Sequence, residues 1–392
     1  MILIKKGKPG HGYSKKSLWK LIIFLIIAIS SILSYKFIER NRVNQKNILS
    51  GEDKFIGNGQ VILELYIWDD EQSYIMPVVE AYNLLQTEAH INVNVLKSDK
   101  YDDLMKSYIS ESGKKIDLFG VRGISQVIQY QETGNLIDLT EYLEDSDIDV
   151  TAYGSMFNDI TLDGRYYAMP TRSTCWALFY NKDIFDAKKL PYPGQMTWEE
   201  YADLAIRLTS GEGEKKIWGG YWVTWCCNFG ALQHNSSLLD DDLSHARESL
   251  LLLNRFYSID KSHMPFTEMD GISAECRDMF NNGKIAMMPQ GEWMVNMLME
   301  DEKNGVCSVN WDIAPMPVFD GVEEGTTWGQ YQFIAISSET EWPKEAFSFL
   351  KFLCDKEGAR IYARNGMIHA YYDDEIKKIY MSAVERESAS IF

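Results

Sequence analysis

The residues of this chain that can do chemistry do not fall into the spacings that catalytic or metal sites require. The six histidines lack the HExxH spacing and the cysteine pairs of zinc sites; they are His11, His90, His234, His245, His263 and His369. The sequence has no GxxxxGK(S/T) or GxGxxG phosphate-binding loop and no GxSxG nucleophile elbow. We therefore predict no catalytic residue, no metal site and no cofactor.

Abundant carboxylates leave one enzymatic interpretation open. The two acids that flank a glycosidic bond can lie far apart in a sequence, so a glycosidase pair is compatible with this chain, although nothing singles one out. The acidic run Asp240, Asp241 and Asp242 lacks the glycine and the distal glutamate of a calcium loop, and we interpret it as a solvated turn.

Charge and aromatic content indicate the kind of ligand. The formal net charge of −18 argues against nucleic acid, because binding to phosphates requires a basic face. The 11 Trp and 22 Tyr residues supply flat rings that can stack on an apolar ligand face while their polar edges form hydrogen bonds. This composition suggests an organic ligand such as a sugar, with packing in the core as the alternative for any single ring.

Six cysteines allow fifteen complete pairings and match no CxxC or zinc pattern; they are Cys175, Cys226, Cys227, Cys276, Cys307 and Cys354. A disulfide is possible outside the cell, but a chain of this size does not require one. Buried free thiols are an equally good interpretation.

The start of the chain predicts export. The uncharged segment 21–33 follows six lysines and no acidic residue. We expect a basic region at 1–17, a membrane anchor or signal segment at 18–38 and a linker at 39–60. No small-x-small cleavage site stands out, which favours an anchor that holds the protein at the outer face of the cell membrane; a cleaved signal would make it a secreted protein. The roughly 340 remaining residues predict two lobes.

Hydrophobic periodicity predicts an α/β fold. Alternating apolar residues predict strands at 61–67 and 91–95, and helical spacing is seen at 75–85 and in a polar stretch at 101–112. A further apolar run at 116–121 predicts another strand. Strands that alternate with helices indicate βαβ units around a largely parallel sheet.

Three local sequence patterns predict secondary structure farther along the chain. Asp163-Gly164 between two strand-like runs predicts a tight hairpin turn. Thr197 and Glu200 form the pattern of a capping box at a helix start, and Pro343 opens another helix. A strand is predicted at 176–180.

Five segments taken together resemble the family 1 extracellular solute-binding proteins of bacterial ABC importers, the group that includes the maltose-binding proteins. Their order and spacing over roughly 61–370 carry the resemblance, since no single motif is decisive. The segments are LYIWD at 65–69 with the helix at 77–82 and IDL at 116–118; GNLIDL at 134–139; DG at 163–164 through AMP at 168–170 to LFYNKD at 178–183 and TWEE at 197–200; FNNGKIAM at 280–287 with GEW at 291–293; and APMP at 314–317, a Gly-rich segment ending at 329 and the helical region 343–366.

The resemblance implies a two-lobed periplasmic-binding-protein-like fold with hinge strands and a ligand cleft between the lobes. It places the crossings near 170–175 and 315–319, with lobe 1 at 61–172 and 318–366 and lobe 2 at 173–317 and 367–392. Two departures stand out. The lipidated cysteine of many relatives is absent, and relatives continue with more helices beyond the position of Phe392, so we expect the second lobe to be incomplete at its C-terminus.

Polar candidates for the site come from loops and crossings. Asp69 and Asp70 follow a strand, where ligands bind in open α/β sheets, although acids capping a helix are equally expected there. Arg122 ends a strand and is either a ligand for hydroxyl or carboxylate groups or a surface ion pair. Arg172 and Thr174 lie at the first implied crossing and face the cleft if that crossing is placed correctly.

Aromatic candidates come from the resemblance. Trp293 matches a position where the family carries a ligand-stacking ring, and its neighbour Glu292 is either a hydroxyl ligand or an exposed acid. Trp222 and Trp225 flank a segment that supplies contacts in relatives, with core packing as the alternative. Two further candidates, Trp328 and Tyr331, follow the second crossing.

The sequence thus favours reversible capture of a sugar or small oligosaccharide and its delivery to ABC permease subunits, without covalent chemistry. Two alternatives stay open. A membrane-anchored sugar sensor that signals to a kinase is one, and a glycoside hydrolase is the other.

Overall fold

The computed structural model describes residues 55–56, 60–85, 88–110, 114–154, 156–223, 225–265 and 273–392. The basic region, the predicted anchor and nearly all of the predicted linker lie outside these residues. Among the described residues, we find no helix with the length and apolar character needed to cross a membrane. Internal contacts divide the chain into two compact units, Met1–Gln60 and Val61–Phe392, and the description below concerns the second unit.

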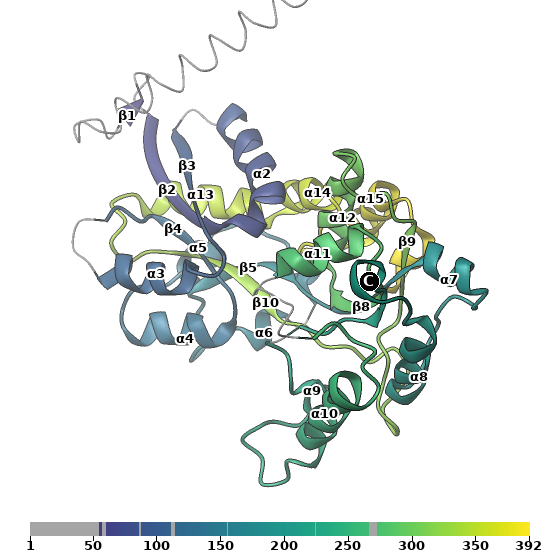
Figure 1. The fold of residues 1–392 in the computed structure, drawn as a ribbon. Helices are drawn as coiled ribbons and strands as arrows, with labels where there is room; N and C mark the ends of the chain where they lie inside the picture. Colours follow the sequence, from purple (N-terminus) through teal and green to yellow (C-terminus); the bar gives the residue numbers. More distant parts are fainter. Residues whose placement is uncertain are drawn as a thin grey trace, which may run out of the picture. The chain divides into compact units, whose positions relative to one another are not determined.

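Two sheets form the framework of this unit (Figure 1). In sheet 1, β2 pairs with β3 and β4, and β10 pairs with β4 and β5. Sheet 2 has the order β7-β8-β6-β9. The bounds are β1 (Phe55–Ile56), β2 (Gln60–Trp68), β3 (Ala89–Leu96), β4 (Leu118–Val121), β5 (Ala168–Ser173), β6 (Trp176–Asn181), β7 (Trp218–Gly220), β8 (Ile285–Gly291), β9 (Trp311–Ala314) and β10 (Tyr331–Ile336).

Helices and single turns connect and cover the strands. The α-helices are α2 (Gln72–Leu85), α3 (Tyr101–Ser110), α4 (Ile124–Glu132), α5 (Thr140–Glu144), α6 (Met156–Asp159), α7 (Lys182–Lys188), α8 (Trp198–Leu208), α9 (Phe229–Gln233), α10 (Ser244–Asn254), α11 (Ser273–Asn281), α12 (Trp293–Lys303), α13 (Pro343–Cys354), α14 (Lys356–Arg364) and α15 (Asp374–Val384). The short turns are η1 (Asp69–Glu71), η2 (Val150–Tyr153), η3 (Gly213–Lys215), η4 (Arg255–Ile259) and η6 (Glu387–Ile391).

We call sheet 1 with α2, α3, α4, α13 and α14 lobe 1, and sheet 2 with α7 to α12 lobe 2. The helices α2 and α13 contact each other and the strands β3, β5 and β10, while α7, α8 and α11 contact strands of sheet 2. The chain leaves sheet 1 after β5 and enters sheet 2 with β6, and it returns between β9 and β10. The mixed α/β architecture is the one predicted from the sequence.

The prediction of a largely parallel sheet is wrong. Among the strand pairs whose register the structure describes, β2–β3, β2–β4 and β7–β8 are parallel, whereas β10 is antiparallel to β4 and β5, and β6 is antiparallel to β8 and β9. A parallel neighbour is reached through a helical crossover within one sheet. The chain instead reaches β6 and β10 from a strand of the other sheet. The periodicity of a single strand does not predict its direction relative to its neighbours.

The predicted local signals are confirmed. Leu162 and Arg165 exchange backbone hydrogen bonds of 2.9 and 3.0 Å around Asp163 and Gly164, both of which have positive φ. The capping box at Thr197 is complete. The backbone N–H of Glu200 donates to Thr197 Oγ1, and the Glu200 carboxylate accepts a hydrogen bond from the backbone N–H of Thr197. Pro343 is the first residue of α13, where its missing N–H costs no helical hydrogen bond.

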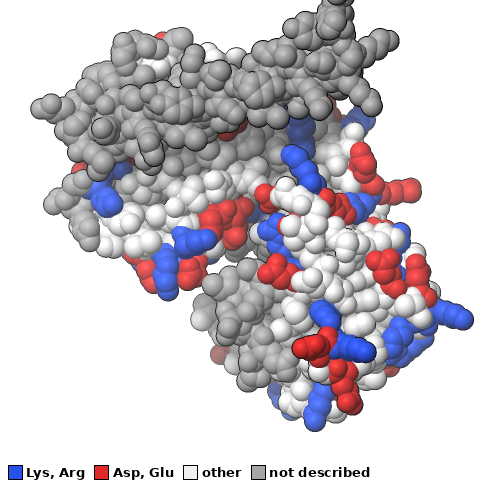
Figure 2. Space-filling model, turned by 45° about the horizontal axis from the view of Figure 1, so that its top comes forward, with Lys and Arg blue, Asp and Glu red and all other residues white. Residues whose placement is uncertain are grey.

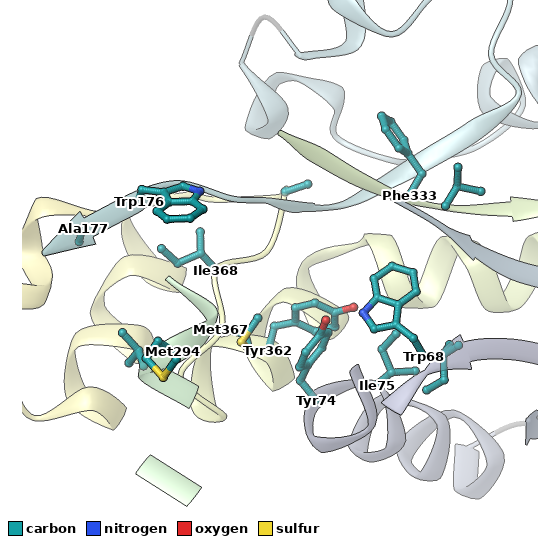
Figure 3. Packing of buried hydrophobic residues seen from close by; sticks show 14 of the residues in the cluster. Trp68, Tyr74, Ile75, Trp176, Ala177, Met294, Phe333, Tyr362, Met367 and Ile368 are labelled. Carbon is teal, nitrogen blue, oxygen red and sulfur yellow. The ribbon is translucent and has the colours of Figure 1, made fainter. Parts of the chain in front are cut away.

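One apolar core runs through both lobes. Figure 3 shows Trp68 and Ile75 of lobe 1, the neighbouring rings of Tyr74 and Tyr362, and Trp176, Met294 and Ile368 beyond them. The centroids of Tyr74 and Tyr362 lie 4.9 Å apart in an edge-to-face arrangement. Four of the six cysteines are buried, and all six are free thiols in the structure.

The surface carries charges of both signs. On the face shown in Figure 2, basic and acidic side chains lie next to one another. Ion pairs of this kind include Lys356 with Asp373 and Arg360 with Glu375. Exposed pairs like these contribute about 1 kcal/mol or less each, so the core and not the surface charge stabilises the fold.

Candidate functional site

The two crossings between the sheets are tied together at Thr174. Its hydroxyl donates to the backbone carbonyl of Gln330 at 3.0 Å and accepts from the Gln330 backbone N–H at 2.9 Å. A Cβ on the adjacent Gly329 would lie 1.6 Å from the Thr174 carbonyl oxygen, so this close approach requires glycine. Thr174 is therefore buried in the hinge region, and its side chain is used to join the crossing segments.

Arg172, on β5, connects the two lobes through its guanidinium group. Its Nε donates to Glu292 Oε1 at 2.8 Å, and Glu292 immediately precedes α12 of lobe 2. Its Nη1 donates to the Tyr74 hydroxyl of α2 at 3.1 Å and to Gln332 Oε1 at 3.0 Å. Both charged side chains are almost fully buried, with 5% and 0% exposure for Arg172 and Glu292. Arg172 thus lies at a junction to which both lobes contribute.

Burial and ion pairing have opposite effects on the pKa values of Arg172 and Glu292. Burial raises the pKa of Glu292, while the guanidinium of Arg172 opposes that rise. Burial also works against the charge of Arg172, yet the Glu292 carboxylate keeps the pKa of Arg172 above its ordinary value. The Glu292 carboxylate further accepts the backbone N–H of Cys175 at 3.3 Å, which fixes α12 to the first crossing.

A second buried acid lies close to this junction. Glu71, the last residue of η1, accepts a 3.4 Å hydrogen bond from the Tyr74 hydroxyl through Oε1, while its Oε2 is buried without a hydrogen-bond partner. Burial raises its pKa to about 8, and the charges of Arg172 and Arg122 oppose the rise. Glu71 is therefore largely protonated at neutral pH, because its carboxyl group is desolvated.

Four tryptophans of lobe 2 and the returning crossing pack around a fifth, Trp176, and we call these five residues the tryptophan wall. Trp176, the first residue of β6, lies at the centre with 4% exposure. Its ring centroid is 6.1 Å from Trp222, 5.3 Å from Trp225, 5.7 Å from Trp293 and 5.2 Å from Trp328. Trp222 is fully buried, whereas Trp225 is 61% exposed. The wall thus has a buried back and an exposed front.

Local sequence explains how Trp293 reaches the wall. It is the first residue of α12; Gly291 ends β8, and Glu292 lies between the strand and the helix. A Cβ on Gly291 would lie 1.9 Å from Cζ3 of Trp293, so only glycine allows the indole to fold back over the strand end. The guanidinium of Arg172 lies 5.5 Å from the Trp293 ring, so Trp293 is the member of the wall that contacts the buried junction.

The lobe 1 candidates form a polar face made of Asp69, Asp70 and Arg122. Asp69 pairs with Lys97 at 2.8 Å and accepts the backbone N–H of Ser98 at 2.9 Å. Arg122 donates to the carbonyl oxygen of Ser98 at 2.8 Å and lies over the ring of Trp68 at 4.7 Å. Partial burial disfavours the charge of Asp69, but the hydrogen bonds from Lys97 and the Ser98 backbone, together with the charge of Lys97, outweigh it and lower the pKa of Asp69.

A cavity of about 590 Å³ lies between the lobes. Asp69, Asp70 and residues of α2 line one side, and residues of α11 and α12, such as Arg277 and Met297, line the other. The lobes touch beside it, where the Ser73 hydroxyl donates to Asn296 Oδ1 at 2.8 Å. The tryptophans are not among its lining residues, so the cavity and the wall are separate features in this conformation.

The structure thus gathers some of the sequence candidates and separates others. Trp222, Trp225, Trp293 and Trp328 come together in the wall, with Arg172, Glu292 and Thr174 at the adjoining crossings. Asp69 and Arg122 meet at Ser98 in lobe 1, and Asp70 is exposed at the cavity. Tyr331 begins β10, and burial together with the carboxylate of Asp159 raises its pKa.

Four contributors were missed by the sequence analysis. Trp176 was read only as a strand residue, although its place directly after the implied crossing was a usable signal. Glu71 continues the Asp69-Asp70 pair in the same strand-to-helix loop. For Tyr74 and Gln332, which both bind Arg172, the sequence contains no signal that we can identify.

This arrangement suits binding of a neutral, hydroxyl-rich molecule. Exposed indole faces can stack on the apolar face of a ring, and carboxylates, amides and the guanidinium of Arg122 can exchange hydrogen bonds with hydroxyl groups. The combination of apolar rings with a few oriented polar groups is typical of small-molecule sites.

Known proteins share the fold of this chain. A maltodextrin-binding protein of Bacillus subtilis is 19% identical over 342 residues, covering 83% of this chain and 74% of that protein. The crystal structure of a sugar transporter from Rhizobium etli in an open conformation is 28% identical, with a TM-score of 0.67 and coverage of 84% of this chain and 86% of that one. A Listeria monocytogenes ABC substrate-binding protein in complex with cycloalternan is 24% identical, with a TM-score of 0.74 and coverage of 84% and 85%.

The family model described as bacterial extracellular solute-binding protein matches residues 68–360, which is most of the chain. The match contains sheet 2, the strands β3, β4, β5 and β10 of sheet 1, both crossings and the tryptophan wall. On this basis, the chain belongs to the family of bacterial extracellular solute-binding proteins.

Proposed function

We propose that this protein is the solute-binding component of an ABC importer and that it binds a sugar or oligosaccharide reversibly between its lobes. Membership of the family indicates an extracellular location for the chain. The observation that carries the proposal is the tryptophan wall at the crossings, because it presents the exposed ring of Trp225 beside the buried Arg172–Glu292 junction that joins the two lobes.

Carbohydrate fits this site better than other small solutes. A sugar ring has an apolar face of C–H groups, which suits the indole rings of lobe 2, and a rim of hydroxyls, which suits the polar groups of lobe 1. Several similar structures were solved with carbohydrates or sugar alcohols, including cycloalternan, mannobiose and D-mannitol. Uncharged ligands also suit a chain with a formal net charge of −18, which has no excess of cations to attract anionic solutes.

We propose individual roles for the side chains on the basis of their burial and contacts. Trp225 and Trp293 stack on the ligand, and Trp176, Trp222 and Trp328 hold these rings from behind. Asp69, Asp70 and Arg122 accept or donate hydrogen bonds to hydroxyls from lobe 1. Arg172, Glu292 and Thr174 keep the crossings and α12 in place, and Tyr331 lies at the start of the returning strand.

Uptake requires a hinge motion and a partner in the membrane. We assign lobe 1 to residues 61–172 and 318–366 and lobe 2 to residues 173–317 and 367–392, with ligand stabilising the closed arrangement by touching both lobes. ABC permease subunits then receive the sugar. Residues 18–38 would hold the protein at the membrane as an anchor, or direct its secretion as a cleaved signal.

The test is a thermal-shift screen of the protein against mono- and oligosaccharides, including mannotriose and maltotriose. A ligand that binds only the folded protein raises the melting temperature by mass action. We expect at least one sugar to raise it in a saturable way and to be recovered chemically unchanged. A screen in which no sugar shifts the melting temperature, or in which the bound sugar is cleaved, would contradict the proposal.

A further inference from the structure

Lobe 2 contains a cluster of metal-ligating side chains that lies outside the tryptophan wall. His234 follows α9, and His245 and Glu248 lie on α10, so the three residues flank the connection between these helices. Their donor atoms lie within 4.8 Å of one another. The distance from His234 Nε2 to Glu248 Oε2 is 3.6 Å, and that from His245 Nδ1 to the same oxygen is 3.3 Å.

An ordinary surface contact does not explain all three residues. His245 and Glu248 alone would be a common pair at i and i+3 on one helix turn. The ring of His234, however, is stacked on that of His245 with centroids 3.7 Å apart, and its Nε2 is buried without a hydrogen-bond partner. A buried ring nitrogen that faces a carboxylate beyond hydrogen-bond distance is an incomplete interaction.

The spacing of the donors fits a small divalent ion. Zinc binds histidine nitrogen and carboxylate oxygen at about 2.0–2.2 Å, so donors around a tetrahedral ion lie about 3.3 Å apart. Two of the three separations are already close to this value. The third can close by rotation of His245 and Glu248, whose side chains are 36% and 47% exposed, while His234 is held at 17% exposure.

We propose that His234, His245 and Glu248 form a binding site for a divalent transition metal of the zinc class. Two imidazoles and one carboxylate favour such ions over calcium or magnesium, which prefer oxygen ligands. Three protein ligands leave a fourth position for water. The bound ion joins the end of α9 to α10 and thereby closes the connection between them.

This site is distinct from the sugar site but lies close to its back. The ring of His234 is 5.9 Å from Phe319, which stacks on Phe229 at 5.6 Å, and Phe229 in turn packs 4.3 Å from Trp222. The proposal does not depend on the proposed function, because metal binding is measured without any sugar.

The experiment is calorimetric titration of zinc chloride into the tag-free, chelator-treated full chain, with cobalt absorption spectra as a second readout. We expect one equivalent of zinc to bind and to raise the melting temperature, with millimolar calcium unable to compete. His245→Ala and Glu248→Gln, both at partly exposed positions, should each weaken zinc binding at least tenfold.

Two matched controls separate this site from other zinc ligands. His90→Ala changes a histidine of β3, and Cys227→Ser changes the exposed thiol; both should leave the zinc isotherm unchanged. Absence of a one-equivalent binding event overturns the proposal. So does a zinc affinity that survives both His245→Ala and Glu248→Gln, or one that is lost in Cys227→Ser.

Discussion

The tryptophan wall of lobe 2 and the polar face of lobe 1 are built on different physical principles. The wall consists of large rings fixed by one another, with Trp176 in contact with four other indoles. On the polar face, Asp69 and Arg122 are held by hydrogen bonds to Ser98 and remain partly exposed. In the proposed function, the wall is a rigid surface formed before ligand binds, and the groups of the polar face exchange water for ligand.

We propose that lobe 2 supplies most of the binding energy and lobe 1 most of the orientation of the ligand. Aromatic contacts contribute binding free energy in proportion to the apolar area that they bury. Exposed polar contacts contribute little, because each replaces a hydrogen bond to water. Four sets of substitutions, described from the largest expected effect to the smallest, test this division.

Two tryptophans of the wall should respond in opposite ways. Trp222→Ala removes a fully buried ring and should lower the free energy of unfolding by about 3–5 kcal/mol. Trp225→Ala removes a ring that is 61% exposed, so stability should stay nearly unchanged while sugar affinity falls about tenfold, or about 1.4 kcal/mol. Urea unfolding and calorimetry measure the two effects. Tyr192→Ala, which removes an exposed ring outside the wall, serves as the control for affinity.

The junction between the lobes should be sensitive to loss of one charge. Arg172→Met leaves Glu292 buried without its partner and should cost about 3–5 kcal/mol of unfolding free energy. The double variant Arg172→Met with Glu292→Gln should regain a large part of this loss, because the uncompensated charge is gone. Equal destabilisation by the single and double variants would show that packing, and not charge, dominates here.

Glu71 should make stability depend on pH. Its pKa of about 8 in the folded state lies above the ordinary value of 4.5, so the native form binds the proton more tightly than the unfolded form. The wild type therefore loses stability as the pH rises from about 4.5 to about 8, and the loss is complete above that range. Glu71→Gln keeps the neutral side chain at every pH. Its stability relative to wild type should rise by a few kcal/mol between pH 5 and pH 8.5 in urea unfolding, since each pKa unit corresponds to about 1.4 kcal/mol.

The smallest effect is expected on the polar face. Asp69→Asn weakens the exposed pair with Lys97, which should change the unfolding free energy by about 1 kcal/mol or less. Sugar affinity should fall only a few-fold, as one hydrogen bond to a hydroxyl is weakened. If Asp69→Asn lowered sugar affinity more than Trp225→Ala does, the larger share of the binding energy would come from lobe 1, contrary to the proposal.

Much of the fold could be predicted from the sequence because its signals are local. The alternation in β2, the capping box at Thr197 and the turn at Asp163-Gly164 depend on residues a few positions apart. Strand direction was predicted wrongly because β6 and β10 enter from another sheet, a fact that no local pattern contains. The family resemblance added the order of segments, which located Trp293 before the structure placed it in the wall.

The site itself was only partly predictable. Trp222 is fully buried and Trp225 is largely exposed, although the sequence made both equally plausible ligand contacts in one short segment. Arg172 binds Glu292 across 120 positions, and His234 meets His245 around a turn whose spacing matches no metal motif. Such pairings depend on tertiary packing, and the ligand roles that we assign to individual side chains remain predictions.

A crystal structure of the protein with the sugar that gives the largest thermal shift tests the central claim most directly. The account predicts the sugar ring in van der Waals contact with Trp225 and Trp293, and hydroxyl groups directed toward Asp69, Asp70 or Arg122. A sugar bound away from these two rings, in contact with one lobe alone, would contradict it.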